Sequence, residues 1–95
     1  MKPKGRPRKS RIIKVLPRIT QFSPRGKPGR PDEVVLNNDE LEVIRLADHL
    51  SLSQKDAAKS MGISQQTFSR ILNHAHKVIS DALVNGKIIR IQETR

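Results

Sequence analysis

The sequence has no Cys, no Trp and no Tyr, and Phe22 and Phe68 are its two Phe residues. Without Cys, the chain can form no disulfide, no Cys-based zinc site and no thiolate nucleophile. The shortage of aromatic side chains argues against folds that stack single-stranded nucleic acid on exposed aromatic platforms. The longest apolar runs have three residues, 34–36 and 82–84. We therefore expect no membrane span and no signal peptide, and a soluble cytoplasmic protein.

The chain of 95 residues has 19 basic and nine acidic side chains, and none of the acidic ones lies near its start. Residues 1–30 hold eleven basic side chains and no acid, and all six Pro fall at or before Pro31. A segment of this composition cannot bury enough apolar surface to fold alone. We therefore expect a basic, partly disordered arm over residues 1–31 and a folded domain over residues 32–95. The arm binds a polyanion in this interpretation, and a solubilising tail is the alternative.

The arm suits DNA better than a membrane, because no amphipathic helix or lipidation motif accompanies its charge. Arg side chains enter the narrow minor groove of A·T-rich DNA, and a Gly-Arg-Pro core gives a slim backbone that can follow the groove. Residues 3–9 resemble an AT-hook, with Lys4 where the hook more often has Arg. A second Gly-Arg-Pro at residues 29–31 precedes two acidic residues, so we interpret it as a turn. The candidate DNA contacts in the arm are Lys4, Arg6, Arg8, Lys9 and Arg11, with contacts to phosphates alone as the alternative.

Four short segments favour β-structure: residues 11–16, 19–22, 34–36 and 87–91. Pro17 ends the first segment, whose apolar side chains predict docking on the domain. The Pro and Gly residues between positions 23 and 31 predict a loop. The last segment could pair with one of the others in a small sheet, and the sequence does not choose among them.

The first predicted helix begins after Asn37, a good N-cap with Glu40 at the third position of a capping box. Ser53 predicts the start of a second, short helix that ends at Met61, and Gly62 supplies a turn with positive φ. The wide apolar face of the first helix predicts a central place in a small bundle. Its expected buried residues are Leu41, Val43, Ile44, Leu46, Ala47 and Leu50.

The third predicted helix begins after Ser64, extends from Gln65 to Val84 and ends at Asn85-Gly86. Two helices joined by a tight Gly turn describe a helix-turn-helix. Apolar residues recur along the third helix at steps of three and four, which predicts one buried face. We expect the apolar residues Phe68, Ile71, Leu72 and Ala75 in the core. The apolar residues further along, Val78, Ile79, Ala82 and Leu83, could belong to the core or to a dimer seam.

A polar face lies opposite that stripe near the start of the third helix. Gln and Asn side chains can pair with adenine, Arg can pair with guanine, and Ser and Lys can bind phosphates. An ordinary solvent-exposed helix face is the alternative interpretation. The candidate DNA contacts on this helix are Ser64, Gln65, Gln66, Ser69, Arg70, Asn73 and Lys77.

The residues from Leu52 to Leu72 resemble the helix-turn-helix of region 4 of bacterial sigma factors. The chain more closely resembles the short prokaryotic proteins grouped as domain of unknown function 134. The elements that carry this resemblance, over about residues 8–92, are a basic start, Leu16-Pro17-Arg18, Phe22-Ser23-Pro24, Glu33-Val34-Val35-Leu36, Asp39-Glu40-Leu41-Glu42, Arg45-Leu46-Ala47-Asp48 and Ala82-Leu83-Val84-Asn85-Gly86-Lys87. The loop from Ser23 to Pro31 is richer in basic residues than expected, which leaves open an added DNA contact. The resemblance implies DNA binding with a regulatory role.

Catalytic alternatives find little support in the sequence. His74 and His76 are two apart on a helix and point in different directions, whereas helical metal ligands need a spacing of three or four. His49, at the end of the first helix, suits a dipole or packing interaction. No phosphate-binding Gly-rich loop or Ser-centred nucleophile motif is present. We expect no enzymatic activity, no cofactor and no metal.

The resulting expectation is a mainly α protein with a three-helix, sigma-like helix-turn-helix core, a long third helix and short flanking strands. Its expected function is sequence-specific binding of double-stranded DNA and regulation of transcription. The alternatives are a module that docks on RNA polymerase or another partner, and an architectural binder of A·T-rich DNA. A homodimer and a nucleoid-associated location are further expectations.

Overall fold

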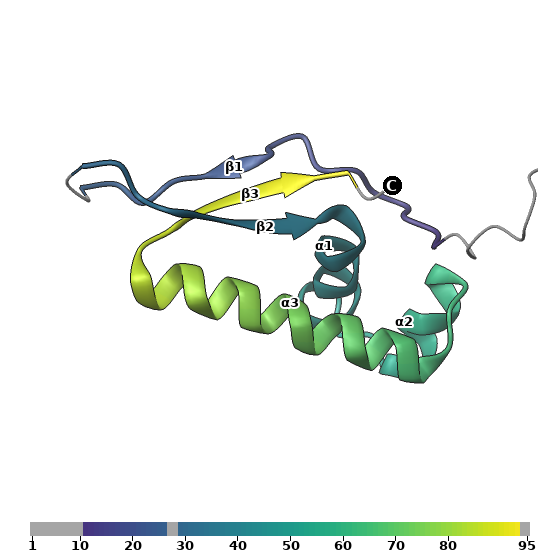
Figure 1. Cartoon of the computed structure of the whole chain (residues 1–95). Coiled ribbons are helices and arrows are strands. Elements are labelled where there is room, and N and C mark those ends of the chain that lie inside the picture. The colour runs from purple at the N-terminus through teal and green to yellow at the C-terminus, as the bar shows by residue number, and fades with distance from the viewer. Residues whose placement is uncertain (1–10, 27–28, 94–95) are drawn as a thin grey trace, which may run out of the picture.

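The computed structural model describes residues 11–26 and 29–93. In this part of the chain, three α-helices and one π-helical segment pack with a three-stranded sheet (Figure 1). The protein is therefore mainly α with a small sheet, as predicted. In chain order the elements are β1 (Gln21–Phe22), β2 (Glu33–Asn37), α1 (Asn38–Ile44), η1 (Arg45–His49), α2 (Gln54–Met61), α3 (Gln65–Asn85) and β3 (Ile88–Gln92).

The other helices α1 and α2 and the strands β2 and β3 all pack against the long helix α3. The sheet lies along the half of α3 that leads into β3, whereas α2 packs at the other end, where α3 begins (Figure 1). Helix α1 lies between the sheet and the first half of α3. Along the described residues, no helix is long and apolar enough to cross a membrane.

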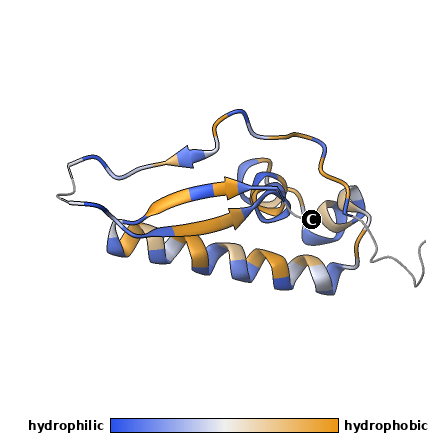
Figure 2. Cartoon of the chain, turned by 45° about the horizontal axis from the view of Figure 1, so that its top comes forward, coloured by the Kyte–Doolittle hydropathy of each residue, from blue (hydrophilic) through white to orange (hydrophobic). Residues whose placement is uncertain are grey.

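The strand order is β1-β3-β2, so the last strand lies in the middle of the sheet. β3 is antiparallel to β1, with Phe22 opposite Ile89, and parallel to β2, with Leu36 opposite Ile91. Leu36 and Ile91 are buried, because alternate residues of a strand face the same side of the sheet and β2 and β3 pack against α3. Figure 2 shows that the two strands beside the long helix are mostly hydrophobic. The predicted pairing of the last segment is confirmed, and it uses two partners instead of one.

The predicted strand over residues 11–16 is wrong. The segment runs along the domain without joining the sheet, because its backbone donors are satisfied by the helices. The Ile12 N–H donates to the carbonyl of Met61 at 3.0 Å, and the Lys14 N–H donates to Glu42 Oε2 at 3.1 Å. The predicted docking therefore occurs through the backbone, while Val15 and Leu16 stay more than half exposed.

The predicted helix starts and turns are confirmed. The Asn37 N–H donates to Glu40 Oε1 at 2.9 Å at the start of α1. Ser53 and Ser64 accept hydrogen bonds from the backbone N–H groups three residues later, at 3.1 and 3.0 Å. Gly62 ends α2 with φ of 69°, and Gly86 ends α3 with φ of 65°, so both turns use a conformation that suits glycine.

The end of the first helix differs from the prediction. Residues Arg45–His49 form π-helical turns, and the Leu50 N–H donates to the carbonyl of Arg45, five residues earlier. The wider turn rotates the following residue away from the apolar stripe. The prediction that Leu50 is buried is therefore wrong, since 47% of it is exposed. Val43 and Leu46 are buried as predicted, and Leu41, Ile44 and Ala47 pack against the core.

Phe68 and Met61 occupy the centre of the core, where neither is exposed to solvent. Along α3, the buried stripe continues through Leu72 and Ala75, and the partly buried Val78 and Ile79 pack against the same cluster. The stripe ends before Leu83, which is 74% exposed. Most of the segment that could have formed a dimer seam thus packs within its own chain. The buried cluster consists of Leu36, Val43, Leu46, Ala57, Ala58, Met61, Phe68, Leu72, Ala75 and Ile91.

Candidate nucleic-acid interface

The polar face of α3 is exposed because the opposite face is buried. Phe68, Leu72 and Ala75 fix the rotation of the helix, since α1 and α2 pack around its first half. The side chains about half a turn away must therefore point outward. Six of the seven residues predicted to contact DNA at α3 are exposed, and Ser69 is half-buried. The exposed six are Ser64, Gln65, Gln66, Arg70, Asn73 and Lys77.

The two predicted Ser contacts have partners within the protein. Ser64 accepts the Thr67 N–H and donates to Thr67 Oγ1 at 2.9 Å, so its hydroxyl caps α3. Ser69 is half-buried and donates to Gln54 Oε1 on α2. Ser69 thereby joins α3 to α2.

The Lys and Arg side chains of α2 and α3 differ from the other described charged groups in their partners. Within the described residues, each of the six ion pairs uses a different carboxylate, so at least six of the nine acidic side chains have Arg, Lys or His partners. In contrast, no ion pair with another described residue engages the cations of α2 and α3: Lys55, Lys59, Arg70 and Lys77. These four side chains are exposed and have no carboxylate partner in the described part of the chain.

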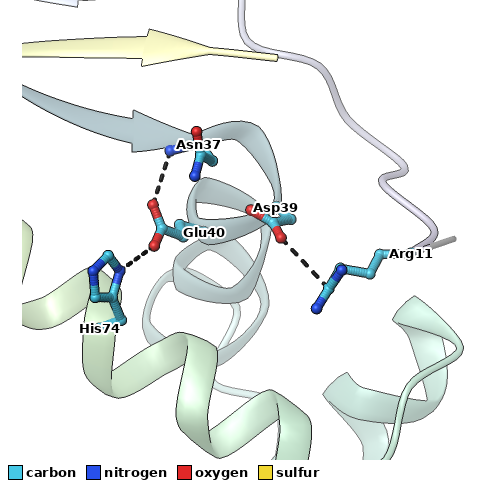
Figure 3. Close-up of polar contacts among 5 residues, drawn as sticks. All are labelled: Arg11, Asn37, Asp39, Glu40 and His74. Atoms are coloured by element: carbon cyan, nitrogen blue, oxygen red, sulfur yellow. Dashed lines mark hydrogen bonds and ion pairs between the residues drawn. The ribbon is translucent and has the colours of Figure 1, made fainter. Parts of the chain in front are cut away.

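Two His residues connect the middle of α3 to the preceding helices. Nδ1 of His74 contacts Glu40 Oε2 on α1 (Figure 3), and Nε2 of His76 lies 2.7 Å from Asp48 Oδ2 on η1. The two His residues flank the buried Ala75. Sequence reasoning missed these contacts, although two His residues on either side of a core position could have suggested them. Within residues 11–26 and 29–93, no group of three His, Asp or Glu side chains could hold a metal ion.

Glu42 is the most buried charged side chain of the first helix, with an exposure of 1%. Burial alone raises the pKa of its carboxyl group. Hydrogen bonds from Arg45 and from the Lys14 N–H together lower the pKa by more than burial raises it, so the pKa of Glu42 lies below the usual value. Both Arg45 hydrogen bonds are 2.9 Å long. Glu42 thus joins the N-terminal segment to η1, a role that the sequence did not suggest.

The arm residues Lys4, Arg6, Arg8 and Lys9 lie outside the described residues. Arg11 is described, and its Nε lies 3.4 Å from Asp39 Oδ2 (Figure 3). Arg11 therefore faces the domain and not open solvent. Residues 29–31 contain Gly29 with φ of 77°, which fits the predicted turn. His49 is exposed at the end of η1.

The chain matches a known family over almost its whole length. The model for "Protein of unknown function DUF134" covers residues 1–94. A UPF0251 protein of Prosthecochloris aestuarii is 45% identical over 89 residues, which are 93% of this chain and 57% of the relative. A UPF0251 protein of Caldicellulosiruptor bescii is 51% identical, over 92% of this chain and 61% of the relative.

Another UPF0251 protein, from Thermoanaerobacter pseudethanolicus, is 47% identical over 88 residues, which are 92% of this chain and 75% of the relative. The chain thus spans less than two thirds of the length of several relatives. No solved structure is significantly similar to it. The match over residues 1–94 and these identities establish that the chain belongs to the DUF134 family.

Proposed function

We propose that this protein binds double-stranded DNA at specific sequences and regulates transcription. In this proposal, α2, the turn at Gly62 and α3 act as a helix-turn-helix similar to region 4 of sigma factors. The observation that supports it is the surface of α3 up to Lys77: one face is buried, and the other presents amides and two cations that have no ion pair among the described residues. Such a function places the protein on the nucleoid.

The chemistry of the exposed side chains matches the base edges of the major groove, which is wide enough to admit a helix. Gln66 and Asn73 can pair with adenine N6 and N7, and Arg70 can pair with guanine O6 and N7. Lys77 suits a phosphate at the groove edge. The 21 residues of α3 span about 31 Å at ~1.5 Å per residue, so only the first turns enter the groove while the rest packs on the sheet.

Selection from a random duplex library by the full chain tests this proposal, at about 150 mM salt to weaken nonspecific binding. We expect enrichment of one sequence motif. The double variant Gln66→Ala/Arg70→Ala should lose preference at individual positions of that motif. Its matched control, Arg18→Ala/Gln92→Ala, removes the same two side-chain types from exposed positions outside α3 and should keep the motif. No enrichment, or an unchanged motif in the first variant, would refute the proposal.

A second function, docking on a protein of the transcription machinery, is supported by a different surface. Leu16, Ile19 and Phe22 lie on the extended N-terminal segment, and each is more than half exposed. Such apolar side chains are typical of protein interaction sites. For a docking module, the variant Leu16→Ser/Ile19→Ser would lose its partner, whereas DNA selection would yield no motif. Selection of A·T content alone would instead favour an architectural DNA binder.

A further inference from the structure

The strand β1 lies at one edge of the sheet. Among the described residues, the order β1-β3-β2 leaves the outer side of β1 without a neighbouring strand (Figure 1). The Ile91 N–H donates to the carbonyl of Thr20 at 2.9 Å, and Gln21 is the next residue, opposite Arg90. Because successive backbone groups of a strand point to alternate sides, the N–H and C=O of Gln21 point away from β3. A further strand can therefore form hydrogen bonds at this edge.

Apolar side chains accompany the free edge. Leu16, Ile19 and Phe22 are 63%, 60% and 54% exposed. Phe22 lies opposite Ile89, which packs against the core, so both residues are on the helix side of the sheet. Phe22 nevertheless stays half in solvent, because α3 packs against β2 and β3 and β1 is the strand farthest from it (Figure 1). This surface suits a protein partner, since a DNA backbone would leave the apolar side chains in water.

The segment that leads through β1 is positively charged. Arg18 lies between Leu16 and Ile19, and Arg25 follows β1. Both Arg side chains are exposed, and neither forms an ion pair with another described residue. The sequence has no acidic residue between positions 11 and 31. Because opposite charges stabilise the pairing of neighbouring strands, acidic side chains are favoured in the partner.

The opposite edge of the sheet, β2, has a different character. It begins with the acidic Glu33, directly after the acidic Asp32. Its most exposed large apolar side chain, Val35, is only 38% exposed. An acidic strand would be repelled there, since like charges on neighbouring strands are destabilising. The two edges therefore differ in charge and in apolar exposure, and both differences favour β1.

We propose that β1 is a docking site for an extended segment of another protein, in which acidic and apolar residues alternate and which adds a fourth strand to the sheet. Backbone hydrogen bonds to Gln21 hold the segment, and pockets between alternate side chains select it. Its apolar side chains cover Ile19 and Phe22, and its carboxylates pair with Arg18 and Arg25. This inference goes beyond DNA binding and rests on the docking surface of the second function.

Selection from a random peptide library by the full chain tests this inference. We expect enriched peptides with several acidic residues and with apolar residues at every second position. The affinity of one enriched peptide is then measured by fluorescence anisotropy. It should fall at least about tenfold for Leu16→Ser/Ile19→Ser, which removes two apolar contacts. The matched control, Leu83→Ser/Val84→Ser, removes two exposed aliphatic side chains of α3 and should bind the peptide like the wild type.

A second pair of variants tests the backbone of β1. Gln21→Pro removes the N–H that points away from β3, whereas Gln21→Ala removes the side chain and keeps the N–H. We expect loss of peptide binding in the first variant and wild-type binding in the second. In the wild type, the bound peptide should slow the hydrogen exchange of the Gln21 amide. This measurement decides the matter even if Gln21→Pro does not fold.

Three outcomes would overturn the inference: no enriched peptide, enriched peptides without acidic residues, or an equal exchange rate of the Gln21 amide with and without the peptide. If the exchange rate is equal but Leu16→Ser/Ile19→Ser weakens binding, docking through side chains stands and strand addition is excluded. Selection from the duplex library is repeated with Leu16→Ser/Ile19→Ser, which should keep the wild-type DNA motif. Absence of any motif for the wild type would contradict DNA binding alone, which separates the two failures.

Discussion

The two halves of α3 have the same helical backbone but opposite surroundings. In the first half, Phe68 is fully buried, whereas Arg70 is an exposed cation without an ion pair among the described residues, as is Lys77 just past the midpoint. In the second half, the charged residue Asp81 pairs with Lys87 at 2.9 Å, and the exposed side chains include Leu83 and Val84. One half thus presents hydrogen-bonding and charged groups, and the other supports the sheet.

This difference shows how one long helix can have two roles. The sheet covers the second half and joins it to the N-terminal segment through β3, while α1 and α2 hold the first half by its apolar face. Rigid packing on one face is what makes the other face suitable for recognition, because the exposed side chains are then presented on a fixed backbone. The comparison predicts that substitutions in the two halves have different consequences.

The largest expected effect comes from two large apolar residues of the same helix. Phe68→Ala should lower the free energy of unfolding by about 3–5 kcal/mol, because it opens a cavity in the core. Leu83→Ala should change it by less than about 0.5 kcal/mol, since 74% of Leu83 is exposed. Urea denaturation measures both values, and Phe68→Leu replaces the first variant if that variant does not fold. Equal losses of unfolding free energy for Phe68→Ala and Leu83→Ala would contradict the difference in packing between the two halves of α3.

The second effect extends the comparison to α1, which packs on the first half of α3. Glu42→Ala removes the partner of Arg45 and of the Lys14 N–H, and we expect a loss of about 2–3 kcal/mol. Glu33→Ala is the matched control, because Glu33 also pairs with an Arg, Arg90, but on the exposed side of the sheet. Its effect on urea denaturation should be much smaller.

The pH dependence of stability follows from the same carboxylate. The pKa of Glu42 is lowered in the folded state, so the unfolded state binds more protons in acid and stability rises with pH. The contribution of Glu42 should be complete above its ordinary pKa of 4.5 and be lost as the pH falls below that value. Urea denaturation between pH 3 and 7 should therefore show a smaller acid loss for Glu42→Gln than for the wild type. An identical acid loss would contradict this.

A smaller effect on stability should distinguish the two glycines that end helices, Gly62 after α2 and Gly86 after α3. Gly62→Ala and Gly86→Ala both place a side chain at positive φ, at a cost of about 1–2 kcal/mol. Gly62→Ala should cost more, because the new Cβ would also lie 3.3 Å from Ile12 Cδ1. Thermal melting of both variants measures the difference. A larger loss of stability for Gly86→Ala would show that the Ile12 side chain can move away from a Cβ atom at position 62 at little cost.

Local signals in the sequence predicted the elements that depend on neighbouring residues. Ser53, Gly62 and Ser64 gave the bounds of α2 and the start of α3, because caps and turns act over three or four positions. The spacing of Phe68, Leu72 and Ala75 gave the buried face of α3, and therefore the exposed face.

Contacts between distant residues could not be predicted in the same way. The pairs Arg11–Asp39 and His74–Glu40 join positions about 30 residues apart, and no local pattern specifies them. The choice of β3 as the central strand depends on how the whole chain packs. The burial of Leu50 was predicted wrongly because the π-helical turns at Arg45–His49 change the helical period.

The most direct test of the central claim is the affinity of the Arg70→Ala variant for every single base-pair substitution of the selected DNA site. If the first half of α3 reads the major groove, this variant should lose about 1–3 kcal/mol of discrimination at one base pair and remain selective at the others. Arg18→Ala, which removes another exposed Arg outside α3, should leave every position unchanged. A uniform loss across all sequences for Arg70→Ala would contradict base reading by α3.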